Sequence, residues 1–163
     1  MEAVMSSHTA KLTFPADDQI LITREFAAPK HLVYRAVTDP ELVKKWWNAK
    51  RGEVTVSEID LRVGGKWRSA MVTPDGFEVA FHGEYLEIVP NERVVQTESY
   101  EGAPEAGATT NTMTLEENDG RTLLTVLIQC PNKEVRDAIV ESGMEAGLQD
   151  AYDLLEEVAV SLG

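Results

Sequence analysis

The hydrophobic periodicity of the sequence changes once, and this change constrains the fold more than any other feature. Between residues 54 and 129, apolar and polar side chains alternate in short runs, which is the period of β-strands. From residue 132 to the end, apolar side chains recur at spacings of three and four, which is typical of amphipathic helices. The sequence therefore predicts an antiparallel sheet followed by a long C-terminal helix, which is an α+β arrangement.

Turn chemistry divides the alternating region into six predicted strands. Pairs such as Asp75-Gly76 and Asp119-Gly120 favour tight turns, because glycine readily adopts the positive φ that many such turns need. Closely spaced strands joined in this way form an antiparallel meander. The predicted strands are 54–59, 66–72, 78–88, 93–99, 109–117 and 121–129.

The N-terminal part predicts a hairpin and two short helices. Residues 9–14 and 19–26 alternate as strands on either side of a turn. Helices are expected at about 29–38 and 40–47, the second of them capped by the carboxylate of Asp39. These helices should lie between the hairpin and the meander in chain order.

The C-terminal part carries two helix-start signals. Asn132 can cap a short helix, and Ser142 with Glu145 has the spacing of a capping box, which predicts where the long helix begins. The length of the chain suits one domain with a substantial core. Residues 1–8 are therefore expected to be a loose terminus and residues 9–163 a single domain.

Glycines should bend this sheet sharply. Gly64, Gly65 and Gly83 have no side chain at the inside of a bend, so a twisted sheet can curve there. A long helix laid across the concave face of such a sheet does not fill it completely. The sequence therefore predicts an interior space between the sheet and the helices, and concave apolar spaces of this kind are the usual sites for small molecules.

The tryptophans lie in two segments, residues 39–47 and 60–67, that carry a family resemblance. The chain resembles the SRPBCC superfamily, whose helix-grip (START/Bet v-like) fold wraps a curved antiparallel sheet around a long C-terminal helix, with two short helices after the first strand of the core. Within that superfamily it is similar to single-domain homologues of the C-terminal domain of the heat-shock-chaperone ATPase activator. The segments that carry the resemblance are 22–29, 33–42, 45–47, 60–67, 83–93 and 142–147.

The resemblance implies a fold more directly than a function. Members of the family serve as chaperone co-activators, small-ligand binders and resistance proteins, and a shared fold does not select among these roles. The separate N-terminal domain with which the eukaryotic activators engage their partner has no counterpart in these 163 residues. A small hydrophobic molecule is therefore the first expected partner and a chaperone the second.

Large or polarizable side chains on the predicted inner surfaces are the candidates for ligand contact. Indole rings can wall a pocket and donate a hydrogen bond, although plain core packing explains them equally well. Consecutive helical residues point about 100° apart, so only one of Trp46 and Trp47 can face the interior squarely, and Trp47 is favoured. The rest of the wall is expected to be largely aliphatic, with methionines that suit loosely specified ligands or simply fill the core. The candidate cavity residues are Trp47, Trp67, Met71, Phe81, Met113, Met144, Leu148 and Tyr152.

No residue pattern in the sequence indicates catalysis, a metal or a cofactor. Serine-histidine-acid sets, phosphate loops and His-Glu-x-x-His motifs are missing. His82 could act as a general base, but beside Glu84 on the polar face of a strand it is more often a solvated or hydrogen-bonded residue. The opposite face of that strand, with Phe77 and Phe81, is expected to be buried. Cys130 is expected to be a structural thiol.

The acidic composition limits the partners. The formal net charge of −13, from 28 acidic and 15 basic residues, disfavours nucleic acid as a general partner. A single cysteine excludes an internal disulfide, and neither a signal-peptide pattern nor a membrane-spanning apolar run of about 18 residues occurs. A cytoplasmic location is therefore expected. Exposed strands such as residues 9–14 could pair between chains, which leaves a homodimer open.

Three hypotheses for the function follow. The first is a non-catalytic binder of a small hydrophobic or amphipathic molecule between the sheet and the C-terminal helix. The second is a protein-interaction module similar to a chaperone cofactor. The third is a cyclase-type or hydrolase-type enzyme, which requires at least two polar titratable groups that converge inside the cavity.

Overall fold

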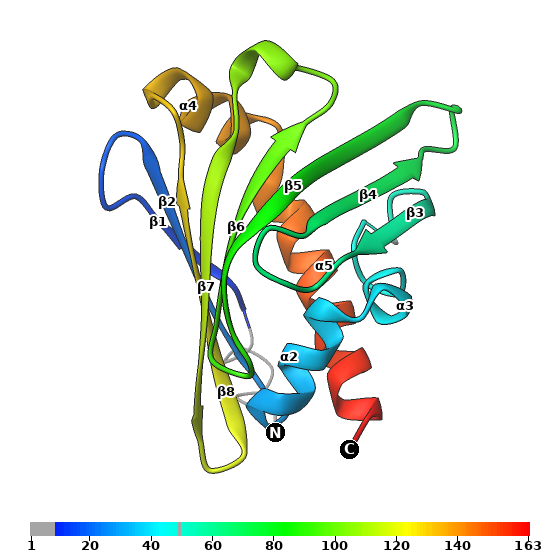
Figure 1. The fold of residues 1–163 in the computed structure, drawn as a ribbon, viewed down its shortest axis with the longest axis vertical. Coiled ribbons are helices and arrows are strands. Elements are labelled where there is room, and N and C mark those ends of the chain that lie inside the picture. Colours follow the sequence, from blue (N-terminus) through cyan, green and yellow to red (C-terminus); the bar gives the residue numbers. More distant parts are fainter. Residues whose placement is uncertain (1–8, 49) are drawn as a thin grey trace.

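One curved antiparallel sheet and a long helix dominate the structure, a computed structural model that describes residues 9–48 and 50–163. Within the described residues, eight strands pair in the order β1-β2-β8-β7-β6-β5-β4-β3. In Figure 1 the strands fan out from β1 and β2 on the left to β3 and β4 on the right, and α5 runs between the two sides. The elements are β1 (Lys11–Thr13), β2 (Gln19–Phe26), α2 (Lys30–Thr38), α3 (Pro40–Val43), β3 (Glu53–Ile59), β4 (Lys66–Val72), β5 (Glu78–Val89), β6 (Arg93–Tyr100), η1 (Pro104–Ala106), β7 (Thr109–Asn118), β8 (Arg121–Gln129), α4 (Lys133–Glu141) and α5 (Met144–Ser161).

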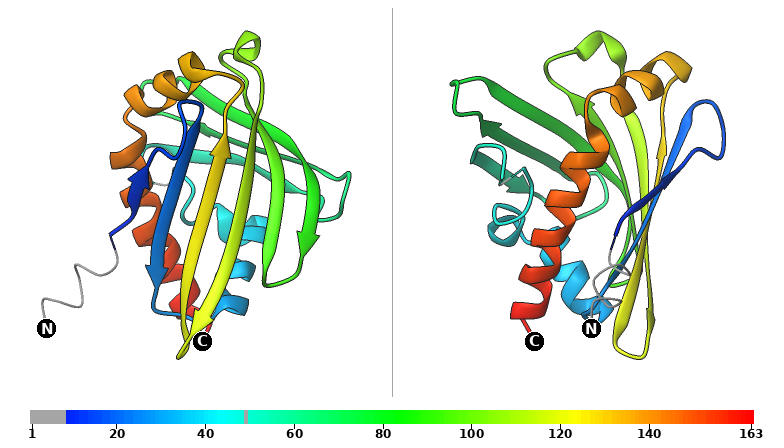
Figure 2. Two further views of the ribbon diagram at one scale, coloured as in Figure 1. Left: turned by 90° about the vertical axis from the view of Figure 1, so that its left-hand side faces the viewer. Right: turned by 180° about the vertical axis from the view of Figure 1, so that it is seen from behind.

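The two faces of the sheet differ in what covers them. Figure 2 shows α5 lying across one face, which we call the inner face, whereas no described helix covers the opposite face of β2, β8 and β7. β3 is interrupted by a bulge between Val54 and Val56, and β5 by one between Tyr85 and Glu87. Bulges increase local twist and bend a strand. The α+β helix-grip fold expected from the sequence is confirmed.

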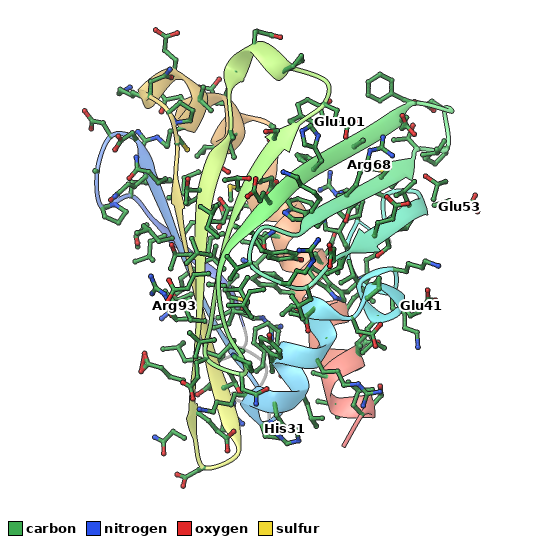
Figure 3. All side chains as sticks on the ribbon, viewed as in Figure 1. His31, Glu41, Glu53, Arg68, Arg93 and Glu101 are labelled. Carbon is green, nitrogen blue, oxygen red and sulfur yellow. The ribbon has the colours of Figure 1, made fainter. Side chains whose placement is uncertain are left out.

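The main core fills the space between the inner face and the helices. Alternate residues of β2 are buried, including Ile20, Ile22 and Phe26, because side chains of a strand point to opposite faces in turn. Leu155 of α5 and Val33 of α2 are fully buried against them. Figure 3 shows side chains filling this region densely. Each such side chain contributes roughly 1.5–3 kcal/mol by leaving water.

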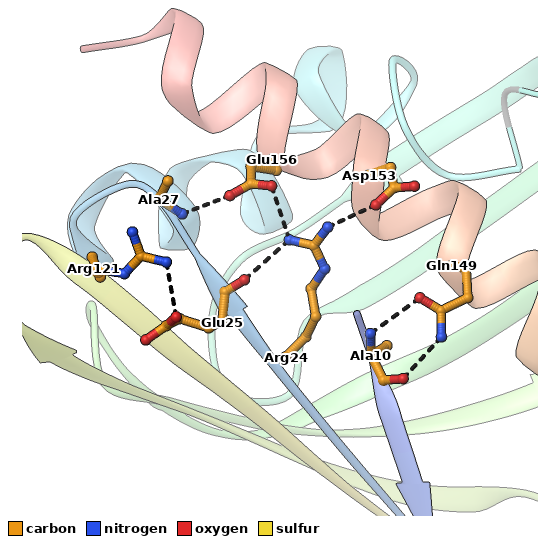
Figure 4. A network of polar contacts seen from close by, with 8 residues as sticks. All are labelled: Ala10, Arg24, Glu25, Ala27, Arg121, Gln149, Asp153 and Glu156. Atoms are coloured by element: carbon orange, nitrogen blue, oxygen red, sulfur yellow. Dashed lines mark hydrogen bonds and ion pairs between the residues drawn. The ribbon is translucent and has the colours of Figure 1, made fainter. Parts of the chain in front are cut away.

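A polar network fastens α5 to β2 (Figure 4). The guanidinium of Arg24, which is 2% exposed, donates to Asp153 Oδ1 at 2.7 Å and to Glu156 Oε1 at 3.2 Å. One turn earlier, the side-chain amide of Gln149 exchanges two hydrogen bonds with the backbone of Ala10. Charge-assisted bonds to a buried cation have defined geometry, so this network sets the position of α5 on the sheet.

The second short helix is shorter than the sequence predicts. Asp39 caps it as expected, because its carboxylate accepts a hydrogen bond from the backbone N–H of Glu41 at 2.9 Å. The helix ends at Val43, however, and residues 44–48 continue as turns up to Asn48, which has a φ of 50°. After Val43 the backbone N–H groups of Lys45 and Trp46 bond to carbonyls three residues back, so the α-helical pattern stops and the expected extension to residue 47 is wrong.

The predicted capping box at the start of α5 is also wrong. The hydroxyl of Ser142 donates to the carbonyl of Ile139 at 2.6 Å, so this side chain closes α4. Gly143 stands at the N-cap of α5 with a φ of 89°, a conformation that glycine adopts without steric cost. The Asn132 cap of α4 is confirmed, since its side chain accepts from the backbone N–H of Val135. The strand expected at residues 9–14 is reduced to Lys11–Thr13.

Candidate functional site

Trp67 lies flat against the backbone of the neighbouring strand on the inner face. Its indole N–H donates to the carbonyl oxygen of Thr97 on β6 at 3.1 Å, and the ring reaches that oxygen by crossing Gly83 of β5. A Cβ atom at Gly83 would stand 1.8 Å from the Thr97 oxygen and 2.6 Å from Trp67 Nε1. Gly83 therefore makes room for the ring, and the indole donor of Trp67 is already used within the protein.

Trp67 belongs to a second apolar cluster at the β4–β6 side of the inner face. Its buried members are Trp67, Tyr85 and Val94, and the partly buried Phe81 and Met113 pack against them. Tyr34 of α2 contacts both this cluster and the main core. The fold thus brings together three of the predicted candidates, namely Trp67, Phe81 and Met113.

The adjacent tryptophans take different partners, as their helical offset predicts. Trp46 packs against the main core, its ring 6.5 Å from that of Tyr152, and its indole N–H donates to the carbonyl of Ala36 at 2.9 Å. Trp47 instead meets Phe81 edge-on at 6.0 Å. The preference for Trp47 as the residue facing the core is therefore wrong. Its contact with a ligand stays a prediction, at the edge of the second cluster.

The remaining candidates divide between the main core and β4. Tyr152 is buried, with its ring 5.8 Å from that of Phe26, and the half-buried Met144 and Leu148 pack near it along α5. Met71 is buried on β4. Ligand contact by these residues also stays a prediction.

A polar patch lies on the inner face between the two apolar clusters, where the sequence predicted an aliphatic wall. Glu98 of β6 shares this face with Val94, and Asn111 of β7 shares it with Met113, because both pairs are an even number of residues apart. The amide of Asn111 donates to Glu98 Oε1 at 2.8 Å, and the hydroxyl of Thr109 donates to Asn111 Oδ1 at 2.9 Å. The expected aliphatic wall is thus wrong at this position.

Several polar atoms of this region lack a hydrogen-bond partner among the residues that the structure describes. Among the described residues, no hydrogen bond is made by Glu98 Oε2, by the side chain of Gln96 or by the hydroxyls of Tyr85 and Tyr152. In the same part of the chain, only Arg24 Nε is both unpartnered and shielded from solvent. Solvent therefore reaches Glu98 Oε2, the side chain of Gln96 and the two tyrosine hydroxyls, although these groups lie on or face the concave side of the sheet. We call Tyr85, Gln96, Glu98, Asn111 and Tyr152 the inner polar cluster.

Burial governs the protonation of this cluster. It raises the pKa of the Glu98 carboxyl, and the hydrogen bond from Asn111 opposes that rise only in part. Burial also raises the pKa of Tyr152, and the nearby negative charge of Glu98 raises it further. The pKa of Tyr85 is raised by burial and by its neighbour Tyr34. Charged forms are thus disfavoured here unless a bound group compensates them.

The outer face of the same strands carries a different arrangement. Arg68 of β4 donates two hydrogen bonds to Glu101, at 2.8 and 2.9 Å, and His82 Nδ1 lies 2.9 Å from Glu101 Oε2. The Arg68 hydrogen bonds, helped by His82, lower the pKa of Glu101 to about 2. An open hollow of about 270 Å³ lies beside these residues, lined by Glu58, Lys66, Trp67, Arg68, His82 and Gly83.

The two histidines of the described residues, His31 and His82, do not form a common site. His82 takes the hydrogen-bonded role that its position on a polar strand face favoured. His31 stands at the start of α2, far from Arg68 and Glu101 (Figure 3), and His8 lies outside the described residues. Nowhere in residues 9–48 and 50–163 do three histidine, cysteine or acidic side chains gather as metal ligands would.

Phe77 and Cys130 differ in how their surroundings match what the sequence predicts. Phe77, expected to be buried, is 62% exposed because it precedes β5 in the β4–β5 turn, beyond the edge of the helix layer. Cys130 is buried, and burial raises the pKa of its thiol, which agrees with a structural role.

The inner polar cluster could have been found in part from the sequence. Met113 was expected to line the cavity, so the alternation of the strand places Asn111 and Thr109 on the same, inner face. Glu98 lies opposite Thr109 in the β6–β7 register. That register, and the approach of Tyr152 from α5, come from strand pairing and helix docking, which the sequence pattern leaves open.

Comparisons with known proteins agree on family and fold. The model of the family described as Activator of Hsp90 ATPase homolog 1-like protein matches residues 27–159. A crystal structure of a Rhodobacter sphaeroides protein is 25% identical with a TM-score of 0.86, covering 94% of this chain and 99% of that one. A Chromobacterium violaceum protein is 30% identical with a TM-score of 0.78, covering 88% and 98%. No curated protein matches the chain.

A third solved structure also matches the chain, and the helices bear on whether it could cross a membrane. A protein from Nitrosomonas europaea is 26% identical with a TM-score of 0.80, covering 93% of this chain and 99% of that one. In the part of the chain that the structure describes, no helix has the length and apolar character needed to cross a membrane.

Proposed function

The chain belongs to the family of Activator of Hsp90 ATPase homolog 1-like proteins, and from that premise we propose that it binds a small hydrophobic or amphipathic molecule beneath α5. The family suggests a ligand-binding or cofactor-like domain. The proposed site is the inner face of β5, β6 and β7, where the inner polar cluster lies between two apolar clusters.

One observation carries this proposal. Polar atoms that fold into a protein interior normally find partners there, and unsatisfied ones cost free energy. Glu98 Oε2 and the hydroxyls of Tyr85 and Tyr152 have none among the described residues, and they remain reachable by solvent within largely apolar surroundings. An apolar surface with a few uncommitted polar atoms is the usual composition of a small-molecule site.

The proposed site beneath α5 can be blocked with a bulky side chain to test this function. Leu148 of α5 is half-buried against the main core, so Leu148→Trp should fill the proposed site. Val160 is 50% exposed on the same helix, which makes Val160→Trp the matched control. Titration with an environment-sensitive hydrophobic dye should show binding to the wild type and to Val160→Trp, and at least about tenfold weaker binding to Leu148→Trp.

Two outcomes would contradict the proposal. The dye could fail to bind the wild type, or it could bind both variants alike. Circular dichroism must show that Leu148→Trp is folded, because overpacking a core costs about 1–3 kcal/mol. If that variant is unfolded, Met144→Trp, one turn earlier on α5, tests the same space.

The other two hypotheses stay predictions. The description of the matching family names an activator of a chaperone ATPase, which keeps a protein-interaction role open for this chain. The charge of Glu98 acts on Tyr152, so two titratable groups lie near one another on the inner side, which keeps the enzyme hypothesis open. The absence of a nucleophile pattern in the sequence still favours binding over catalysis.

A further inference from the structure

The carboxylate of Glu98 is held in one orientation by a chain of hydrogen bonds. The hydroxyl of Thr109 donates to the oxygen of the Asn111 amide, which leaves the amide nitrogen pointing at Glu98. That nitrogen donates to Glu98 Oε1 at 2.8 Å. Because Oε1 is engaged in this way, Oε2 is the carboxylate oxygen that has no hydrogen-bond partner among the described residues.

The neighbouring groups do not neutralise this carboxyl. Tyr152 approaches from α5, and its pKa responds to the charge of Glu98, but no hydrogen bond joins the two side chains. Arg24 of β2 also acts on Tyr152, yet its guanidinium is committed to Asp153 and Glu156. Glu98 therefore lacks a cationic partner among the described residues, in surroundings that disfavour its charge.

We propose that the ligand is an amphipathic molecule whose polar end donates a hydrogen bond to Glu98 Oε2, as an amine or an alcohol does, while its apolar part lies on the second apolar cluster. This inference rests on the proposed function, since it names the chemistry of the ligand at the same site. Carboxylate amphiphiles should bind least tightly, because an ionised head group has no proton to donate and would face a second carboxyl.

The order of affinities follows from the strength of the head-group contact. A protonated amine makes a charge-assisted bond, which is roughly twice as strong as a neutral one, and it supplies the missing positive charge. An alcohol donates a neutral hydrogen bond. The inner face should therefore bind an amine most tightly, an alcohol less tightly and a carboxylate least tightly when the apolar chains are equal.

The test uses three probes with the same chain, decylamine, decanol and decanoate, each displacing the hydrophobic dye from the full-length protein at neutral pH. In the wild type, decylamine should bind at least about tenfold more tightly than decanoate. Glu98→Gln keeps an oxygen for Asn111 but removes the charge, and it should reduce that ratio to about threefold or less. Glu105→Gln, on the exposed η1, changes the net charge equally and should leave the ratio unchanged.

The outcomes separate this inference from the function on which it rests. If the dye does not bind the wild type, the proposed function fails and the inference fails with it. If the dye binds but the three probes displace it equally well, or if Glu98→Gln keeps the wild-type ratio, only the inference is overturned. A fall in the ratio that Glu105→Gln reproduces would also overturn it, because general attraction to an acidic protein would then explain the preference.

Discussion

The two faces of β4, β5 and β6 both carry polar side chains but satisfy them differently. On the outer face, Arg68, His82 and Glu101 bond to one another, and Lys66 pairs with Glu84 at 2.9 Å. On the inner face, Glu98 accepts a hydrogen bond on one oxygen, and its other oxygen has no partner in residues 9–48 and 50–163. The outer groups are thus complete without a ligand, whereas the inner ones are not.

This difference shows why an open hollow is a poorer guide to function than unsatisfied chemistry. Three residues that line the outer hollow already have acidic partners: Lys66 pairs with Glu84, and Arg68 and His82 pair with Glu101. Exposed ion pairs of this kind contribute little to the free energy of unfolding. Their charges are already paired, so a ligand would gain little more from them than from water. The inner polar cluster offers donors and acceptors in apolar surroundings, where each hydrogen bond counts for more.

Adding a methyl group at Gly83 should have the largest effect on stability. Gly83→Ala places a Cβ where Thr97 and the Trp67 ring already lie, so we expect a loss of about 3 kcal/mol of stability. The matched control is His82→Ala, the preceding residue with its side chain outward, which should cost less than about 1 kcal/mol. Urea unfolding measures both. Equal losses would contradict the close packing of Trp67 on the inner face.

Removing the outer carboxylate should have an intermediate effect that disappears in acid. The pKa of Glu101 is lowered to about 2, so its contribution is fully present above the unfolded value of about 4.3 and is lost as the pH falls towards 2. Its side chain is 30% exposed, so Glu101→Gln should cost only about 1 kcal/mol at pH 7. The difference in unfolding free energy between the wild type and Glu101→Gln should shrink from pH 7 to pH 4 and vanish near pH 2.5. A difference that stays constant with pH would contradict the lowered pKa of Glu101.

Removing the inner carboxylate should have the smallest effect, with the opposite sign. Because the pKa of Glu98 is raised, the wild type loses stability as the pH rises above about 4.3, the value of an unfolded glutamate. Glu98→Gln does not titrate, so it should be more stable than the wild type at pH 8 by less than about 1 kcal/mol, and no more stable at pH 4. Thermal unfolding at both pH values measures this. A destabilised variant at pH 8 would mean that Glu98 serves the fold.

The fold was largely predictable because its signals are local. The period-2 alternation of β2 and the three-and-four spacing of α5 each follow from which face of an element is buried. The errors lie at element ends, after Val43, where α-helical bonding stops, and at Gly143, where a positive φ precedes α5. Turns of this kind depend on what the neighbouring segment allows, as Trp46 shows by bonding to Ala36.

The candidate site was predictable only in its apolar part. Trp67, Phe81 and Met113 do gather in one cluster, as large side chains on inward positions should. Glu98 was missed because a glutamate in a strand is usually solvent-facing, and only the pairing of β6 with β7 places it beside Asn111.

The sequence by itself determined the class of fold, the order of the elements and the family, because these depend on periodicity and on motifs within short segments. The tertiary structure decided which polar groups meet. The register of the strands brings the outer Glu101 into hydrogen bonds with Arg68 and His82. Among the described residues, the inner Glu98 side chain is hydrogen-bonded by Asn111 alone, with Tyr152 of α5 nearby. Contacts between distant segments depend on how strands pair and where a helix docks, so the chemistry of the concave face belongs to the assembled sheet and helix.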